Sequence, residues 1–178
     1  MSGGRLLVVT VVGHDRPGII AEATGLLAEL GANLEDSSMT ILRGHFAMVL
    51  VARAEVTAEE AQQALDTLAD DTLSVSVREV PDESEQVRRT QPVGPSYLLS
   101  VHGADRPGIV STVTARISAV GGNVTDLTTR LSDRLYVLVA EVDIPVAADI
   151  DALKERLGDV ARDLGVEVSL RAVATDDL

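Results

Sequence analysis

Hydrophobic and polar positions along the chain predict one order of elements, strand–helix–strand–strand–helix–strand, and predict it twice. The apolar run 6–12 is typical of a buried strand, and Ile19, Ala23 and Leu27 then recur at the spacing of one helix face. In the first half we expect strands at 6–12, 33–42, 45–53 and 73–77, and helices at 17–30 and from Thr57 onward. In the second half we expect strands at 97–101, 123–131, 135–142 and 166–173, and helices at 107–120 and 150–164.

Local signals support these elements. Arg43 and Gly44 separate two strand patterns, as in a hairpin, and Thr57 followed by Glu60 forms the pattern of a capping box at a helix start. In the second strand, Leu34 and the later apolar residues fall on opposite parities. A β-bulge near Asp36 would reconcile them, and the same irregularity recurs near Asp126.

The composition of each strand predicts its place in the sheet. The first and third strands are apolar on both faces and should be central, whereas the fourth alternates as a one-sided strand does. This indicates an α+β fold with ferredoxin-like βαββαβ units, each an antiparallel sheet of order 4-1-3-2 with two helices on one face. The other face then needs cover from the second repeat or from a second subunit.

A repeated motif defines the domain organisation. The segment Gly-His-Asp-Arg-Pro-Gly-Ile at 13–19 returns as Gly-Ala-Asp-Arg-Pro-Gly-Ile at 103–109. Two copies at one large offset indicate two homologous domains rather than a solenoid. We expect a first domain at 1–80, a linker at 81–95 that is rich in proline and charge, and a second domain at 96–178.

The motif also predicts a ligand site. With Pro17 at the first helical position, Arg16 is the expected N-cap, and the following backbone N–H groups lack partners and suit a carboxylate. Asp15 would attract an ammonium group, and Asn33 offers a donor and an acceptor, so a zwitterionic amino acid would satisfy all three. An alternative of about equal weight is structural: Asp15 caps the helix, Gly18 permits packing and Asn33 ends a turn. The candidate ligand-binding residues are Gly13, Asp15, Arg16, Gly18, Ile19 and Asn33, and in the second copy Gly103, Asp105, Arg106, Gly108, Ile109 and Asn123.

On this motif and on the Gly-x-Asn-Leu-Glu-Asp-Ser segment at 31–37, the chain resembles the ACT domain family over nearly its whole length. The resemblance implies small regulatory modules that bind amino acids between neighbouring copies, through the loop before the first helix and the start of the second strand. Within that family the motif is most similar to the glycine cleavage system transcriptional repressors, which have no DNA-binding domain and act through a partner transcription factor. The resemblance leaves the identity of the amino acid open.

Composition narrows the classes of function. The chain of 178 residues has a net charge of −13 and only three aromatic residues, which argues against direct binding of nucleic acid. It contains no cysteine, its apolar runs are too short to span a membrane, and no signal peptide is evident, so we expect a cytoplasmic protein. We expect no metal site, no cofactor and no catalytic residues, because the histidines lack ligand spacing and no nucleophile motif is present.

The sequence therefore predicts a non-catalytic amino-acid sensor, an allosteric regulator that acts through a protein partner. Glycine or another small amino acid is the expected ligand, and a transcription factor is the expected partner. The alternative is a regulatory subunit of an amino-acid or one-carbon enzyme. A third hypothesis is a dimerisation module with vestigial sites. A homodimer would cover the large open sheet surface, and a compact pseudo-dimer within one chain would also suffice.

Overall fold

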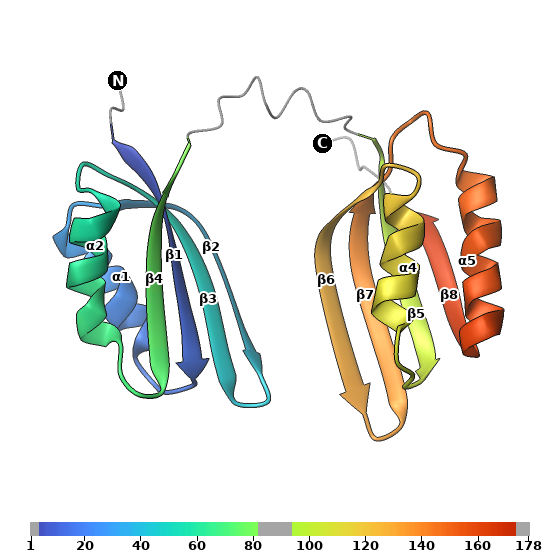
Figure 1. The fold of residues 1–178 in the computed structure, drawn as a ribbon, viewed down its shortest axis with the longest axis horizontal. Coiled ribbons are helices and arrows are strands. Elements are labelled where there is room, and N and C mark those ends of the chain that lie inside the picture. Colours follow the sequence, from blue (N-terminus) through green and yellow to red (C-terminus); the bar gives the residue numbers. More distant parts are fainter. Residues whose placement is uncertain (1–3, 82–93, 174–178) are drawn as a thin grey trace. The chain divides into compact units, whose positions relative to one another are not determined.

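The computed structural model describes residues 4–81 and 94–173. The chain divides into two compact units, Met1–Ser84 and Glu85–Leu178. In each unit the described residues form one four-stranded antiparallel sheet with two helices against one face (Figure 1). Most of the predicted linker, 82–93, lies outside the described residues.

The first unit follows the predicted order of elements. Its sheet order is β2-β3-β1-β4, which is the predicted order 4-1-3-2. The elements are β1 (Arg5–His14), α1 (Ile19–Glu29), β2 (Asn33–Leu42), β3 (His45–Ala54), α2 (Ala58–Leu65), a 3-10 turn η1 (Asp66–Leu68) and β4 (Leu73–Val80).

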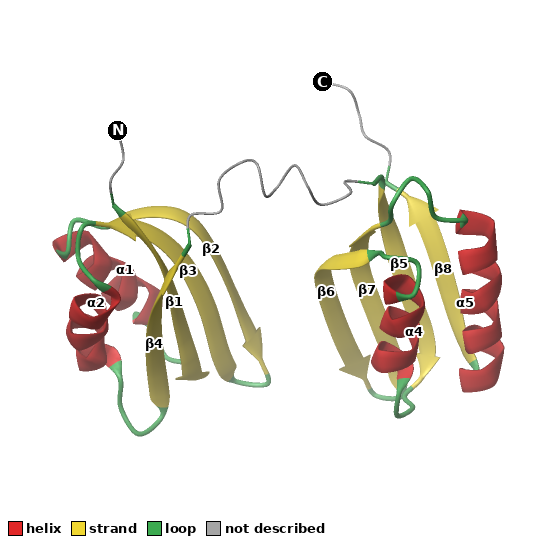
Figure 2. Cartoon of the chain, turned by 45° about the horizontal axis from the view of Figure 1, so that its top comes forward, coloured by secondary structure: helices red, strands yellow, loops and turns green. Residues whose placement is uncertain are grey.

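The second unit repeats this arrangement with the order β6-β7-β5-β8 (Figure 2). The elements are β5 (Ser96–Ala104), α4 (Ile109–Ser118), β6 (Asn123–Ser132), β7 (Leu135–Asp143), α5 (Ile150–Leu164) and β8 (Val166–Ala172). Both halves therefore confirm the predicted ferredoxin-like fold.

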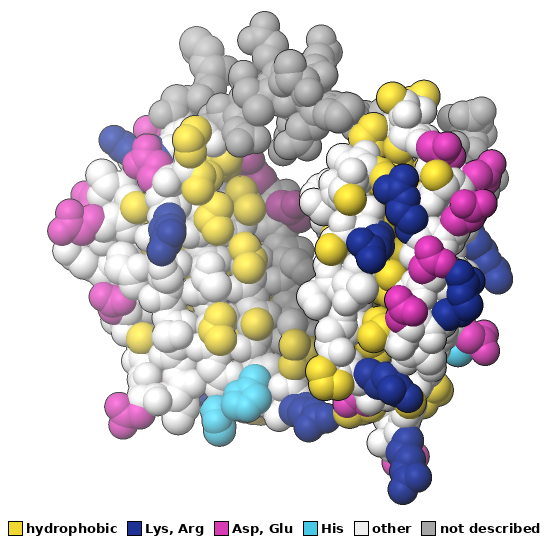
Figure 3. Space-filling view, turned by 45° about the vertical axis from the view of Figure 1, so that its right-hand side comes forward, with side chains coloured by type: hydrophobic (Ala, Val, Ile, Leu, Met, Phe, Trp, Pro, Cys, Tyr) yellow, Lys and Arg dark blue, Asp and Glu magenta, His cyan; other side chains and the backbone are white. Residues whose placement is uncertain are grey.

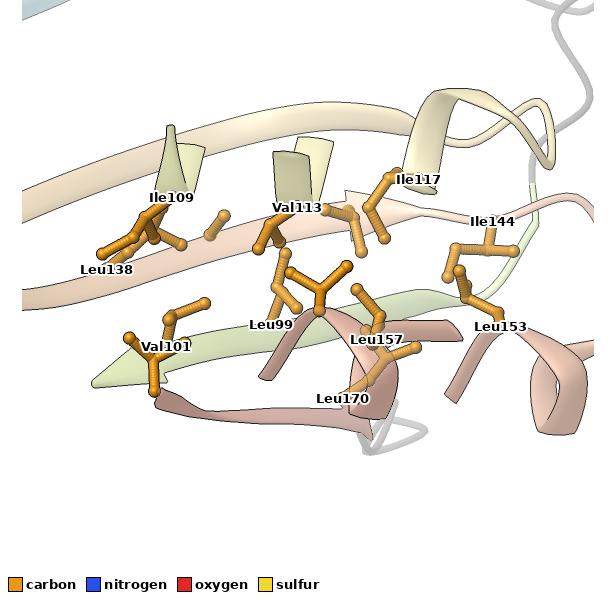
Figure 4. Close-up of a cluster of buried hydrophobic side chains, with 14 residues drawn as sticks. Leu99, Val101, Ile109, Val113, Ile117, Leu138, Ile144, Leu153, Leu157 and Leu170 are labelled. Atoms are coloured by element: carbon orange, nitrogen blue, oxygen red, sulfur yellow. The ribbon is translucent and has the colours of Figure 1, made fainter. Parts of the chain in front are cut away.

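Each unit buries a core between its sheet and its helices. In the first unit Leu7, Val9 and Val11 alternate along β1 toward the helices, and Ile19 and Leu27 of α1 pack in the same cluster as Val9 and Val11. Figure 4 shows the corresponding core of the second unit, where residues of β5 and β7 meet α4 and α5. Every second residue of the central part of β1 is buried, as expected for a strand with one face against the helices.

The predicted local signals are present. Arg43 and Gly44 both have positive φ, 51° and 83°, as a tight hairpin turn requires. Thr57 and Glu60 form the capping box: the Thr57 hydroxyl accepts a hydrogen bond from the Glu60 N–H at 3.2 Å, and the Glu60 carboxylate accepts one from the Thr57 N–H at 2.8 Å. The second strands carry the predicted bulges, since their register shifts between Leu34 and Asp36 and at the equivalent place in β6.

The face of each sheet opposite its helices is open within its own unit. On the first sheet Val12 and Val49 are 45% and 42% exposed, and on the second sheet Leu98 and Val139 are 39% and 40% exposed. Figure 3 shows hydrophobic side chains among uncharged ones over the face of the first unit that it presents. What covers these faces stays a prediction.

Candidate functional site

The predicted start of the first helix in each unit is wrong by two residues. The helices begin at Ile19 and Ile109, and their N-caps are Gly18 and Gly108, with φ of 95° and 91°. These left-handed conformations are open to glycine but strained for other residues, and they break the helix before it can extend back to the proline. Arg16 and Arg106 are therefore not N-caps, and each proline lies in a turn before the helix.

The later helix start changes which backbone N–H groups lack a partner within the helix. The first intrahelical hydrogen bond of α1 runs from the Glu22 N–H to the Gly18 carbonyl at 2.9 Å, so the open donors are the N–H groups of Ile19, Ile20 and Ala21. In α4 the Thr112 N–H donates to the Gly108 carbonyl at 2.9 Å, and the open donors are those of residues 109–111. A turn centred on the proline and the glycine precedes each helix, and it brings the first of these N–H groups back toward the carbonyl of the arginine before the proline. The helix starts keep the partial positive charge of the helix dipole, which favours a carboxylate.

The structure does not support the alternative in which Asp15 caps the helix. No side chain caps α1 or α4, so neither Asp15 nor Asp105 acts as a capping residue. The Asp15 N–H instead donates to the Gly44 carbonyl at 3.0 Å and ties the loop to the hairpin between β2 and β3. Both carboxylates are exposed beside their loops.

Gly13 and Gly103 have a packing role. A Cβ atom at Gly13 would lie 2.1 Å from the Thr72 carbonyl oxygen, and one at Gly103 would lie 3.0 Å from the Val166 Cα. Both glycines therefore allow the end of the first strand to approach the start of the fourth. Among the other predicted residues, Ile19 and Ile109 are 1% and 2% exposed, so only their backbone N–H groups can reach a ligand.

The two loops differ in their charged neighbours. Arg16 binds Glu22 through two hydrogen bonds, and this contact lowers the pKa of the Glu22 carboxyl below its ordinary value. Thr112 replaces Glu22 in the second unit. The Arg106 guanidinium lies instead near Gly165, the C-cap of α5, where the negative end of the helix dipole favours a cation.

The structure does not bring Asn33 to the loop of its own domain. Asn33 pairs with Arg53, which pairs with Leu6, whereas Gly13 lies at the other end of β1 opposite Phe46. Leu6 and Gly13 are seven residues apart in one strand, which corresponds to about 23 Å. Figure 1 shows the same arrangement: β1 runs to one end of the sheet, and α1 carries the chain back before β2 begins.

The second unit has the same separation, because Asn123 pairs with Asp143 opposite Ser96, and Gly103 lies opposite Tyr136. One ligand can contact the loop and the asparagine together only if they come from different copies of the fold.

Asn33 lies instead in a pocket of about 320 Å³ that the sequence analysis did not find. The lining residues are Gly4, Gly31, Asn33, Glu35, Arg53, Ala54 and Glu55. Glu35 of β2 becomes a neighbour of Arg53, near the end of β3, only when these two strands pair. One signal was available in the sequence: Arg53 stands where the second repeat has Asp143.

Two further observations concern binding chemistry. A hollow of about 390 Å³ beside α1 and η1 contains none of the predicted site residues. Within residues 4–81 and 94–173, no three histidine, aspartate or glutamate side chains come close enough to hold a metal ion.

The fold and its duplication define a class of protein: a tandem protein of two ferredoxin-like α+β domains. The ACT domain family pattern matches residues 5–78 and 96–171, so the chain belongs to the ACT domain family.

The chain is also similar to two curated proteins. The glycine cleavage system transcriptional repressor of Escherichia coli is 25% identical over 182 residues, covering 97% of this chain and 93% of the relative. A UPF0237 protein of Methanopyrus kandleri is 47% identical over 73 residues, covering 37% of this chain and 81% of the relative.

Solved structures show the same tandem architecture. A protein of unknown function from Galdieria sulphuraria has a TM-score of 0.78 at 28% identity, over 96% of this chain and 99% of its own. A structure of a proposed glycine cleavage system transcriptional repressor has a TM-score of 0.65 at 19% identity, over 98% and 100%. The family and the full-length relative together support a regulatory, ligand-binding role. Within the described residues no helix is long and apolar enough to cross a membrane.

Proposed function

We propose that this chain is a non-catalytic sensor that binds a small amino acid and reports its presence to a partner protein, as a transcriptional regulator of glycine or one-carbon metabolism. The observation that carries the proposal is the pair of helix starts that no side chain caps, each preceded by the same Asp-Arg-Pro-Gly loop. The full-length similarity to a protein named as a glycine cleavage system transcriptional repressor supports the regulatory role.

The ligand would be held by complementary charges. Its carboxylate would accept hydrogen bonds from the N–H groups of Ile19, Ile20 and Ala21, and its ammonium group would lie beside Asp15. Asn33 would complete the site from a second copy of the chain, since its own loop is about 23 Å away. A ligand held between two copies stabilises their association, and this shift in the association equilibrium is the signal that a partner would detect.

Calorimetry of the full chain against each of the twenty amino acids tests the site. We expect one or a few small amino acids to bind, and Asp15→Ala and Asn33→Ala each to weaken binding. Glu155→Ala, which removes an exposed carboxylate from α5, is the control and should bind as the unaltered chain does. Unchanged affinity in both Asp15→Ala and Asn33→Ala would remove the basis of the assignment.

The partner distinguishes the two regulatory roles. A transcriptional regulator should co-purify with a DNA-binding protein in a way that depends on the amino acid. A regulatory subunit should instead co-purify with an enzyme that loses feedback inhibition when this chain is removed.

A further inference from the structure

The helix side of the first unit carries charge of one sign. Segments 17–30 and 57–72, which contain α1, α2 and η1, have seven exposed carboxylates and no lysine or arginine. Three of these carboxylates, those of Glu29, Glu59 and Asp71, form no hydrogen bond or ion pair with a described residue. This side of the unit therefore attracts cationic partners and repels anionic ones.

A hollow of about 390 Å³, here called the acidic hollow, lies on this side beside α1 and η1. Its lining includes Glu22, Gly25, Leu26, Glu29 and Leu68. Leu26 is half-buried and Leu68 is 5% exposed, so the hollow has an apolar floor, whereas both glutamates are exposed at its rim. This space suits a group that combines an apolar part with positive charge.

Gly25 keeps the acidic hollow open. Glycine in the interior of a helix lowers stability relative to alanine, and a Cβ atom at Gly25 would meet nothing within 4 Å. No described residue packs in that space, so contacts within the first unit do not account for the glycine. The missing side chain lets an external group approach the backbone of α1 closely.

The helices of the second unit carry both signs of charge instead. At the ninety-residue offset, Arg116 and Ala119 stand in place of Leu26 and Glu29, and α5 contains one lysine and two arginines. The face with a single sign of charge is therefore specific to the first unit.

The acidic hollow also adjoins the loop of the repeated motif. Glu22 lines the hollow and accepts two hydrogen bonds from Arg16 of that loop. Ala21, whose N–H is a proposed donor to the ligand carboxylate, lines the hollow as well. A ligand carboxylate at the helix start competes with Glu22 for Arg16, so ligand binding and the charge of the hollow are linked.

We propose that the acidic hollow of the first domain docks a basic amphipathic helix of the partner protein. This inference rests on the proposed function and names the surface that the partner recognises. Glu22 and Glu29 are seven residues apart on one side of α1, about 10.5 Å along its axis, with Gly25 between them. A helix lying along α1 matches this spacing when two cations, two turns apart, flank an apolar side chain that enters the space over Gly25.

Binding of a synthetic peptide to the full chain tests this proposal. The probe is a helical peptide of roughly 18 residues, about five turns, with leucine along one face and lysine on both flanks. We expect it to shift the NMR signals of the backbone amides of 21–29 and 67–68, and to bind more weakly as the salt concentration rises. Gly25→Gln fills the hollow and should weaken binding at least about tenfold. Glu29→Lys replaces attraction by repulsion and should weaken it about fivefold.

Matched controls come from the second unit and from the peptide. Ala115→Gln and Glu155→Gln alter exposed positions of α4 and α5 and should leave the affinity unchanged. A peptide with glutamate in place of lysine should not bind, and one with the same residues in scrambled order should bind at least about tenfold more weakly. Gly25→Gln should fold normally, because glutamine favours a helix more than glycine does.

No binding of the lysine peptide, or equal binding to the unaltered chain, Gly25→Gln and Glu29→Lys, would overturn the proposal. Equal binding of the scrambled peptide would also overturn it, because charge alone would then account for the interaction. A change in the sedimentation of Gly25→Gln without peptide would show that a second copy of the chain occupies the hollow instead. Calorimetry with amino acids keeps the two proposals apart: failure of every amino acid to bind the unaltered chain refutes the proposed function, whatever the peptide does.

Discussion

Arg16 and Glu22 form a two-point ion pair across the first turn of α1, with Nη1–Oε1 and Nη2–Oε2 distances of 2.8 and 2.7 Å. The pair joins the loop of the repeated motif to the helix that follows it. The Glu22 carboxylate also approaches the helix start, since a Cβ atom on Gly18 would lie 3.2 Å from Glu22 Oε1. A ligand carboxylate at the first loop therefore has a negative neighbour that the second loop lacks.

The ion pair predicts a pH effect. The Arg16 hydrogen bonds lower the pKa of Glu22, so the pair stabilises the fold above the ordinary pKa of glutamate, and this contribution is lost as the pH falls through the lowered pKa. In Arg16→Ala we expect the pKa of Glu22 to rise toward its ordinary value, as measured by the NMR shift of its carboxyl carbon during a pH titration. Glu60 is the internal control, because its lowered pKa comes from Thr57 and should not change. A Glu22 titration that is the same in both proteins would contradict the ion pair.

The capping box of α2 predicts a local loss of stability. Thr57→Ala removes the acceptor for the Glu60 N–H and should lower the free energy of unfolding by about 1 kcal/mol. Both tyrosines, Tyr97 and Tyr136, are in the second unit, so tyrosine fluorescence follows that unit while circular dichroism follows both.

We expect Thr57→Ala to shift the urea transition seen by circular dichroism and to leave the tyrosine transition in place. Asp149→Ala is the counterpart in the second unit, since the Asp149 carboxylate accepts a hydrogen bond from the Ala152 N–H at 3.0 Å. It should shift the tyrosine transition. Equal shifts of that transition in the two variants would show that the units do not unfold separately.

Substitution of glycine by alanine should have opposite effects on stability at two positions of the first unit. Gly13→Ala places a Cβ atom 2.1 Å from a backbone oxygen and should destabilise the protein by about 1–3 kcal/mol, because neither backbone can move aside. Gly25→Ala lies in the exposed interior of α1 with nothing within 4 Å, and it should stabilise by about 0.5–1 kcal/mol. Urea unfolding measures both. A stable Gly13→Ala protein would show that β1 and β4 do not approach as closely as described.

The open face of the first sheet predicts self-association. Val49 lies at its centre, 42% exposed, and its strand neighbours on this face are the uncharged residues Ala47, Val51 and Thr10. This patch of uncharged residues has Asp36 and Arg78 at its margin, and we expect two copies of the chain to pack through it.

Val49→Asp would bury a carboxylate in that interface and should lower the association constant at least about tenfold, as measured by sedimentation velocity. Val139→Asp makes the same change at the equivalent position of the second sheet and should have a smaller effect. A chain that remains monomeric at high concentration would contradict this prediction, as would equal effects of the two substitutions.

The helix start shows where sequence reasoning fell short. Proline followed by glycine predicted a helix from Pro17, yet the φ of 95° at Gly18 places the break one residue after the proline. The capping residue depends on the backbone angle of a glycine, and glycine alone adopts left- and right-handed conformations with similar ease. The ligand site itself stays a prediction, with its candidate N–H groups now at the start of the shorter helix.

Local pattern was sufficient for the order of elements, the sheet order, the hairpin at Arg43, the capping box at Thr57 and the bulge near Asp36. Each of these depends on periodicity or on residues a few positions apart, and so it can be found in the sequence itself. The separation of Asn33 from Asp15 and the meeting of Arg53 with Glu35 depend on which strands pair and in which direction. Arg53 and Glu35 are 18 positions apart in the sequence and meet because their strands pair. Asn33 and Asp15 instead lie toward opposite ends of the sheet. Only the tertiary structure decided these two arrangements.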